Sequence, residues 1–144
     1  MAKRRSALNI FLDSSVLFSA VYSVSGGSAK LFTLKNVNLV ASKLVLTEVE
    51  RNVRQKLQSY HLARFFMLAE LLTITESNLS ASEIVLTKKV IAEKDAAILA
   101  DFKKSKCSIL IILDKKDFLQ ERVLKFVKPK RVLTTKMFFG QKWR

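Results

Sequence analysis

The sequence predicts an α/β protein, specifically a three-layer α/β/α sandwich around a central parallel sheet of four or five strands. Short apolar runs such as LNIFL at 8–12 and SILIIL at 108–113 are typical of strands that are buried on both faces. Segments with the apolar spacing of helices separate these runs. Strands that alternate with helices favour parallel pairing through right-handed crossovers.

The remaining elements follow from local patterns along the chain. Ser14 or Ser15 can cap a first helix, and Thr47 opens another in which Val49 and Val53 recur four residues apart. Segment 84–91 has mixed periodicity. The expected strands are 8–12, 44–46, 72–75, 108–113 and 131–133. The other expected helices are 16–21, 29–34, 60–72, 94–102, 118–126 and 135–139.

Composition indicates one domain spanning 1–144, with a core at about 8–139. Of the 144 residues, 49% are hydrophobic, which is enough to fill a core and excludes intrinsic disorder. Three glycines and one proline leave little room for low-complexity linkers or collagen-like repeats. The single Cys107 excludes a disulfide framework and a cysteine-rich zinc site, which suits a reducing compartment, so we expect a cytoplasmic protein.

The strong basic charge predicts a polyanionic partner. Lys and Arg number 26 against 12 Asp and Glu, so the formal net charge is +14. Nucleic acid is the leading candidate partner, with a solvated basic surface as the alternative. Asp13 interrupts the apolar stretch that would otherwise imitate a secretory signal, and there is no apolar run of about 18 residues. We therefore expect no association with membranes.

Several carboxylates fall where predicted strands end or predicted helices begin. Asp13 follows the first strand and Asp114 follows the 108–113 strand, with Asp117 one turn later. Glu48 and Asp95 are each placed in the first turn of a predicted helix. Each residue taken alone can be a helix cap or can complement the helix dipole. Parallel winding, however, would bring these positions together at the carboxyl edge of the sheet, where ligand sites lie.

Converging carboxylates need a counter-cation, because close like charges repel. Hard oxygen ligands are those that Mg²⁺ and Mn²⁺ prefer, and such metals support hydrolysis of phosphodiesters. The acidic positions therefore indicate a divalent metal site in a strongly basic protein.

The order of the motifs FLDSSVLFSAVYSVSGGSAKLF, LTEVERNV, EKDAAILADF and LDKKDFL resembles that of the PIN-domain family, in particular its bacterial VapC-like toxin subgroup. The resemblance runs from about 9 to 139. It implies a three-layer α/β/α fold and a metal-dependent ribonuclease that acts as the toxin of a toxin–antitoxin pair. Relatives of this kind pair with an antitoxin protein and form homodimers, which implies RNA, a cognate antitoxin and a second copy as partners.

The resemblance also implies roles for individual residues. The four acids of the family correspond to Asp13, Glu48, Asp95 and Asp114 as the catalytic residues, and Asp117 is an accessory ligand. The implied ligands of Mg²⁺ or Mn²⁺ are Asp13, Asp95, Asp114 and Asp117. The implied substrate-binding residues are Ser15, Asn52, Lys115 and Lys116.

The chain departs from the family pattern at two positions. Ile112 stands where many relatives have Thr or Ser, and Thr135 stands where Pro is frequent. Two other functions remain open at this point: a non-catalytic nucleic-acid-binding module on the same fold, and a protein-interaction module whose basic surface meets an acidic partner.

Overall fold

Five parallel strands form a single sheet at the centre of the described part of the protein. The structure, a computed structural model, describes residues 7–113 and 115–141. The strand order across the sheet is β3-β2-β1-β4-β5, and every pairing between neighbours is parallel. The strands are β1 (Leu8–Leu12), β2 (Val37–Ser42), β3 (Thr73–Thr75), β4 (Ile109–Ile112) and β5 (Arg131–Thr134). The predicted parallel α/β sheet is therefore confirmed.

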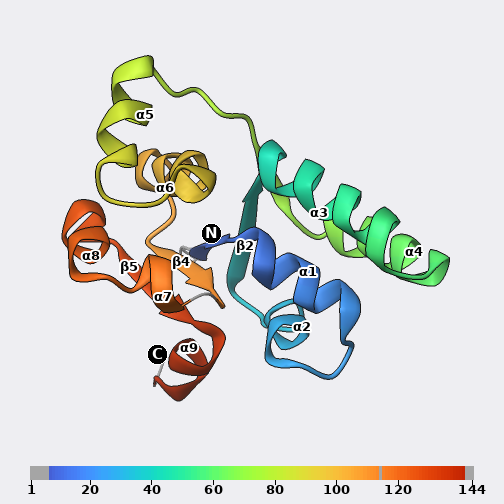
Figure 1. The fold of residues 1–144 in the computed structure, drawn as a ribbon. Coiled ribbons are helices and arrows are strands. Elements are labelled where there is room, and N and C mark those ends of the chain that lie inside the picture. The colour runs from blue at the N-terminus through green and yellow to red at the C-terminus, as the bar shows by residue number, and fades with distance from the viewer. Residues whose placement is uncertain (1–6, 114, 142–144) are drawn as a thin grey trace, which may run out of the picture.

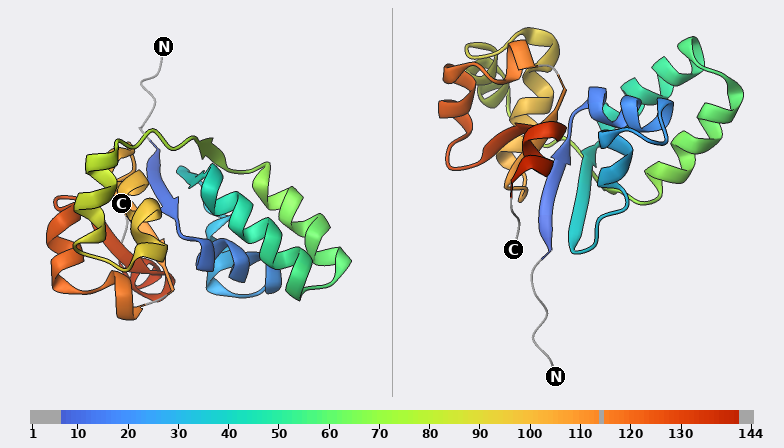
Figure 2. Two further views of the ribbon diagram at one scale, coloured as in Figure 1. Left: turned by 45° about the horizontal axis from the view of Figure 1, so that its top comes forward. Right: turned by 90° about the horizontal axis from the view of Figure 1, so that it is seen from below.

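Helices cover both faces of the sheet and give the predicted three layers. Helices α1 to α4 lie on one side, and α5, α6 and α8 lie on the other (Figure 1). Helices α3 and α4 form an adjacent pair that extends away from the strands (Figure 2). The helices are α1 (Ser14–Tyr22), α2 (Gly27–Leu31), α3 (Lys43–Lys56), α4 (Ser59–Ala69), α5 (Ala81–Lys88), α6 (Glu93–Lys104), α7 (Lys115–Phe118), α8 (Glu121–Val127) and α9 (Thr135–Gly140).

The second strand differs from its predicted position. The segment 44–46 is helical, and the strand is β2, which ends at Ser42. Ser42 Oγ accepts a hydrogen bond from the backbone N–H of Val45 at 3.1 Å and so caps α3. Val45, Val49 and Val53 then repeat every four residues and are all buried, so a helical stripe overrides the β propensity of LVL.

The cap of the first helix also differs from its prediction. Asp13, rather than Ser14 or Ser15, is the N-cap of α1, because its carboxylate accepts the backbone N–H of Ser15. The helix expected at 118–126 is divided into α7 and α8, and α5 begins at Ala81 and overlaps the first part of segment 84–91, whose periodicity is mixed.

The core is centred on β1 and β4, the two strands with the most continuous apolar runs. Phe11, Leu110 and Ile111 are fully buried, and the ring of Phe11 packs against that of Phe102 from α6. Cys107 is buried beside this core. Within the described part of the chain, the helices are too short or too polar to reach across a bilayer.

Candidate functional site

Asp13 lies where the central strand meets its first helix, at the carboxyl edge of the sheet. Its backbone N–H donates to the carbonyl of Ile111 at 3.1 Å, which ties the end of β1 to the end of β4. The side chain is 5% exposed. Its Oδ2 atom accepts the backbone N–H of Ser15 at 3.2 Å and the Ser15 hydroxyl at 2.5 Å. The carboxylate is therefore held in one orientation by the residue two positions later.

Glu48 reaches the same place from α3. It lies in the second turn of the helix, between the buried Val45 and Val49, and is half-buried. The Ser14 hydroxyl donates to its Oε2 atom at 2.7 Å. Because Ser14 directly follows Asp13, this hydrogen bond brings the two carboxylates together. The expectation that Glu48 lies in the first turn of its helix is wrong, because α3 begins at Lys43 rather than at Thr47.

Burial is the main influence on the charge of Asp13. Loss of solvent raises the pKa of its carboxyl above the ordinary value, while hydrogen bonds from Ser15 and Ser14 lower it. The negative charge of Glu48 adds a smaller upward contribution to this pKa. The pair is thus a buried acid beside a second acid, a combination that a cation would relieve.

The other acidic candidates lie near the start of α6 and in α7. Asp95 is in the first turn of α6, which complements the helix dipole, and its Oδ2 atom is buried. Asp117 lies in α7, with its Oδ2 atom 3.8 Å from the ammonium of Lys94 on α6. Asp114, the acid expected after β4, lies outside the described residues.

The described residues bring together only part of the predicted acidic group. Asp13 and Glu48 are joined through Ser14. Over 7–113 and 115–141, there is no group of three or more His, Cys, Asp and Glu residues positioned to hold a metal. Convergence of all four predicted acids therefore stays a prediction.

The residues predicted to bind substrate lie in different surroundings. Ser15 holds Asp13 in place. Asn52 is half-buried one turn after Glu48 on α3, and Lys115 and Lys116 are exposed in α7.

Sequence reasoning missed Ser14. Its only local signal is its place directly after Asp13, since its partner Glu48 is 34 positions away. The hydroxyl could be assigned a role only once α1 and α3 were known to pack against each other.

No protein-family model and no curated protein matches the sequence of this chain. Comparisons by structure did find similar folds. A VapBC complex from Salmonella typhimurium bound to DNA matches with a TM-score of 0.63 and 14% identity, over 89% of this chain and 98% of that one. FitAcB from Neisseria gonorrhoeae matches with a TM-score of 0.63 and 16% identity, over 88% and 98%.

A third similar structure is Mycobacterium tuberculosis VapC20, described as a toxin that cleaves the sarcin-ricin loop. It has a TM-score of 0.54 and 15% identity, over 74% of this chain and 91% of that one. The chain has a VapC-like PIN-domain fold. In the PIN-domain arrangement seen here, the candidate site occupies the carboxyl edge of the parallel sheet, where α/β proteins of this kind place their ligands.

Proposed function

We propose that this protein is a Mg²⁺- or Mn²⁺-dependent endoribonuclease that acts in the cytoplasm as the toxin of a toxin–antitoxin pair. The observation that carries the proposal is the carboxylate pair of Asp13 and Glu48, each held by a serine at the start of α1. Two acids held side by side at a ligand-binding edge, on a VapC-like fold, suit metal-assisted hydrolysis of a phosphodiester.

The donor chemistry fits a hard divalent cation. The proposed metal ligands are Asp13, Asp95, Asp114 and Asp117, and the proposed catalytic acids are Asp13, Glu48, Asp95 and Asp114. All are carboxylates, and two of them, the buried Asp13 and the half-buried Glu48, already lie together, with Asp13 in a setting that disfavours uncompensated negative charge. When bound, the metal supplies a Lewis acid for the phosphodiester and lowers the pKa of a coordinated water.

The chain's own residues fix the geometry. Ser15 donates to Asp13 Oδ2 and Ser14 donates to Glu48 Oε2, so one oxygen of each carboxylate is engaged and the other is oriented by that contact. Pre-set carboxylates lose less freedom when they bind a cation. Lys115 and Lys116, which are exposed in α7, are proposed to contact phosphates of the RNA. Asn52, one turn after Glu48 on α3, is proposed to contact the RNA beside the acidic pair.

The proposal includes protein partners. The Salmonella VapBC and FitAcB structures are complexes, and the chain covers 98% of each similar chain in them. Their likeness in fold supports a cognate antitoxin as partner of this chain, and we propose a homodimer as its state in solution.

A non-catalytic binding module is the second candidate. It is favoured by the strong excess of basic over acidic residues, 26 against 12. In that case the net charge of +14 would bind nucleic acid or an acidic protein without cleavage.

An RNA cleavage assay separates the two candidates. The rate at which total RNA is cleaved in the presence of Mn²⁺ is measured for the purified wild type, Asp13→Asn and Glu121→Gln. Glu121 is an exposed acid on α8 and serves as the control. Asn is as good an N-cap as Asp, so the Asp13 variant should fold while losing at least about 100-fold in rate. Circular dichroism checks the fold. Equal cleavage by all three proteins contradicts the site assignment, and no cleavage by any of them supports the binding module.

A further inference from the structure

Helix α4 is largely apolar on two faces, and the described part of the chain covers one of them. The inward face, with the buried Phe65 and Leu68, packs toward α1 and α3. The outward face carries exposed apolar side chains three or four residues apart, which continue past the helix onto β3. We name this series the α4 stripe, and its members are Tyr60, Ala63, Met67, Leu71 and Ile74. A helix that is apolar all round is normally buried, so the exposed stripe indicates a surface that another molecule covers.

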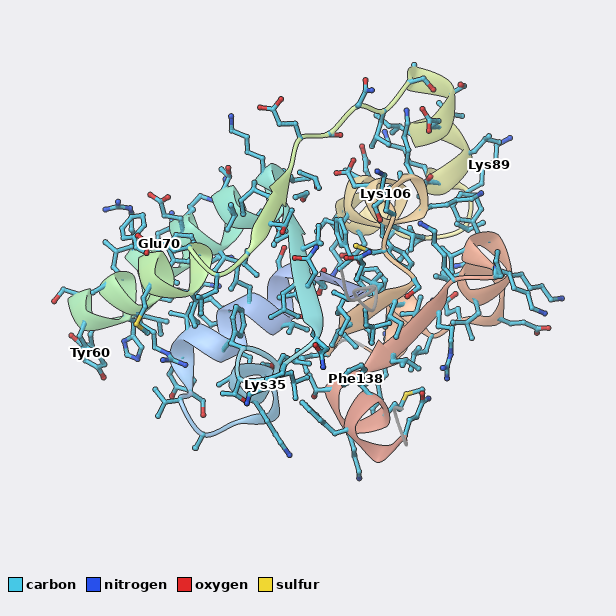
Figure 3. The ribbon with its side chains drawn as sticks, turned by 180° about the vertical axis from the view of Figure 1, so that it is seen from behind. Lys35, Tyr60, Glu70, Lys89, Lys106 and Phe138 are labelled. Atoms are coloured by element: carbon cyan, nitrogen blue, oxygen red, sulfur yellow. The ribbon has the colours of Figure 1, made fainter. Side chains whose placement is uncertain are left out.

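The stripe is continuous from the start of α4 to the edge strand of the sheet. Figure 3 shows Tyr60 near one end of α4 and Glu70 near the other, toward β3. The backbone N–H of Leu71 donates to the carbonyl of Leu68 at 3.0 Å, so the helical winding persists into the turn. On β3, Thr73 and Thr75 line a cavity together with side chains of α6. Side chains alternate along a strand, so Ile74 faces the other side of the sheet, where α3 and α4 lie.

The exposed apolar area approaches what a stable dimer buries. The four large side chains of the stripe, together with the adjacent Phe66, are between 41% and 68% exposed. Large side chains that are about half exposed each present on the order of 100 Å², so these five present on the order of 500 Å². A standard interface buries about 800 Å² on each partner, and in homodimers about 65% of that area is apolar. The two apolar areas are therefore similar.

The stripe is also nearly free of charge, unlike the chain as a whole. Segment 60–75 contains one Arg and one Glu, Arg64 and Glu70, which cancel, whereas the whole chain carries +14. Two copies of so basic a protein repel each other where their cations approach within about 8 Å, the screening length at physiological salt. This repulsion is least at a neutral apolar face. A nucleic acid or an acidic protein would bind where the cations are, so the charge pattern favours a second copy as the occupant.

We propose that the α4 stripe is the surface on which two copies of this chain meet, with their α4 helices antiparallel about a twofold axis at Met67. A twofold contact uses the same patch on both copies, so the patch must complement itself. Ala63 and Leu71 are each four residues from Met67. Antiparallel packing therefore places the small Ala63 of one copy opposite the large Leu71 of the other, a pairing that lets facing helices interdigitate. This surface rests on the homodimer of the proposed function and is independent of metal binding and cleavage.

Sedimentation velocity on the full chain tests the surface. We expect a dimer at about 50 µM that dissociates on dilution. Met67→Glu should weaken the dimer at least about 100-fold, because it sets two like charges against each other at the twofold axis. Val85→Glu is the matched control, since Val85 on α5 is 54% exposed and Met67 is 53% exposed. Both variants should keep the circular dichroism of the wild type, and Val85→Glu should dimerise like it.

Cysteine cross-linking tests the register of the two helices. Met67 is the residue that meets itself across the axis, so Met67→Cys should give a covalent dimer with a bismaleimide of short spacer. Val85→Cys, on α5, should stay monomeric in the denaturing gel. The native Cys107 is 2% exposed, so the wild type should not be cross-linked.

Three results would overturn this assignment. The first is a wild type that stays monomeric at about 200 µM, which would leave the stripe to a partner of another kind, such as an RNA or a helix of a different protein. The second is Met67→Glu that dimerises like the wild type. The third is cross-linking of Val85→Cys in place of Met67→Cys, which would move the contact to α5.

Titration with Mn²⁺ separates this surface from the proposed nuclease site. Met67→Glu should bind Mn²⁺ like the wild type, because the stripe lies on the outward face of α4 and Asp13 follows β1 at the start of α1. If neither protein binds Mn²⁺ while the wild type still dimerises through Met67, the metal site is wrong and the dimer surface is supported.

Discussion

The hydroxyl of Ser14 donates a hydrogen bond to Oε2 of Glu48 at 2.7 Å and so joins the first residue of α1 to the second turn of α3. The next residue, Ser15, donates to Asp13 in the same way. Two consecutive serines therefore each hold one carboxylate, and the backbone of α1 fixes the spacing between the two acids.

Ser14→Ala should slow RNA cleavage by about tenfold. A hydrogen bond to a charged group is worth about 1.5–3 kcal/mol, and about 1.4 kcal/mol in a barrier is tenfold in rate. Ser14→Thr keeps the hydroxyl and should restore most of the rate, while exposed Ser25→Ala should have no effect. Single-turnover rates measure this. If the alanine and threonine variants are equally slow, the hydroxyl has no positioning role.

Ser42→Ala should lower the free energy of unfolding by about 1 kcal/mol, the usual loss for an N-cap. The hydroxyl is fully buried and caps α3 at Val45. Thr47→Ala, in an exposed position inside the same helix, should change stability by less than about 0.5 kcal/mol. Urea denaturation compares the two variants. A larger loss for Thr47→Ala would mean that the helix begins where the sequence pattern alone places it.

The boundary of α3 shows why part of the fold could be predicted and part could not. β4 was predictable because ILII is apolar at every position, as a strand buried on both faces requires. In the segment 44–49 (LVLTEV), β propensity favours a strand and the spacing of the apolar residues favours a helix. The hydrogen bond from the backbone N–H of Val45 to Ser42 caps the helix and so favours the helical form. The spacing of Val49 and Val53, extended back by four residues, reaches Val45 and so indicates the earlier start of α3.

The candidate site was predictable to a similar degree. Asp13 follows directly from its place after a buried strand, and the structure puts it there. The partnership of Ser14 with Glu48 depends on packing between helices 34 positions apart, for which the local pattern holds no signal. Asp101 likewise has no local signal, because in the sequence it is one more acidic residue of a helix. Only the structure shows that its side chain is buried in α6.

The stability of the wild type should fall relative to Asp101→Asn as the pH rises above about 4. Burial raises the pKa of the Asp101 carboxyl in the folded state. Below the ordinary Asp pKa of about 3.9 both forms are neutral and the difference is small. Above that pH the Asp101 carboxyl ionises in the unfolded chain before it ionises in the folded protein. The free energy of unfolding therefore falls with rising pH until the raised pKa of the folded state is passed.

Urea unfolding of both proteins between pH 3 and 8 measures this difference. Glu121→Gln, an exposed acid, should show no such trend. A wild type that gains stability over Asp101→Asn with rising pH would mean that the buried carboxylate is favoured as an anion.

Replacing Lys115 and Lys116 with Ala should reduce the salt dependence of RNA binding. Each phosphate contact on a single strand contributes about 0.7 to the slope of log K against log salt, so the double variant should lose up to about 1.4. Lys35→Ala, in the exposed turn that enters β2 at the other edge of the sheet, should leave the slope unchanged. Fluorescence anisotropy at several salt concentrations gives the slopes, and equal slopes for all three proteins contradict phosphate contact at α7.

Calorimetric titration of Mn²⁺ into the wild type and into Asp13→Asn shows directly whether the acids at the end of β1 form a metal site. We expect saturable binding to the wild type and at least tenfold weaker binding to the variant, because Asp13 is held beside Glu48 as a ligand. Mn²⁺ binding that is absent from the wild type, or equal in both proteins, would contradict a metal site at the end of β1.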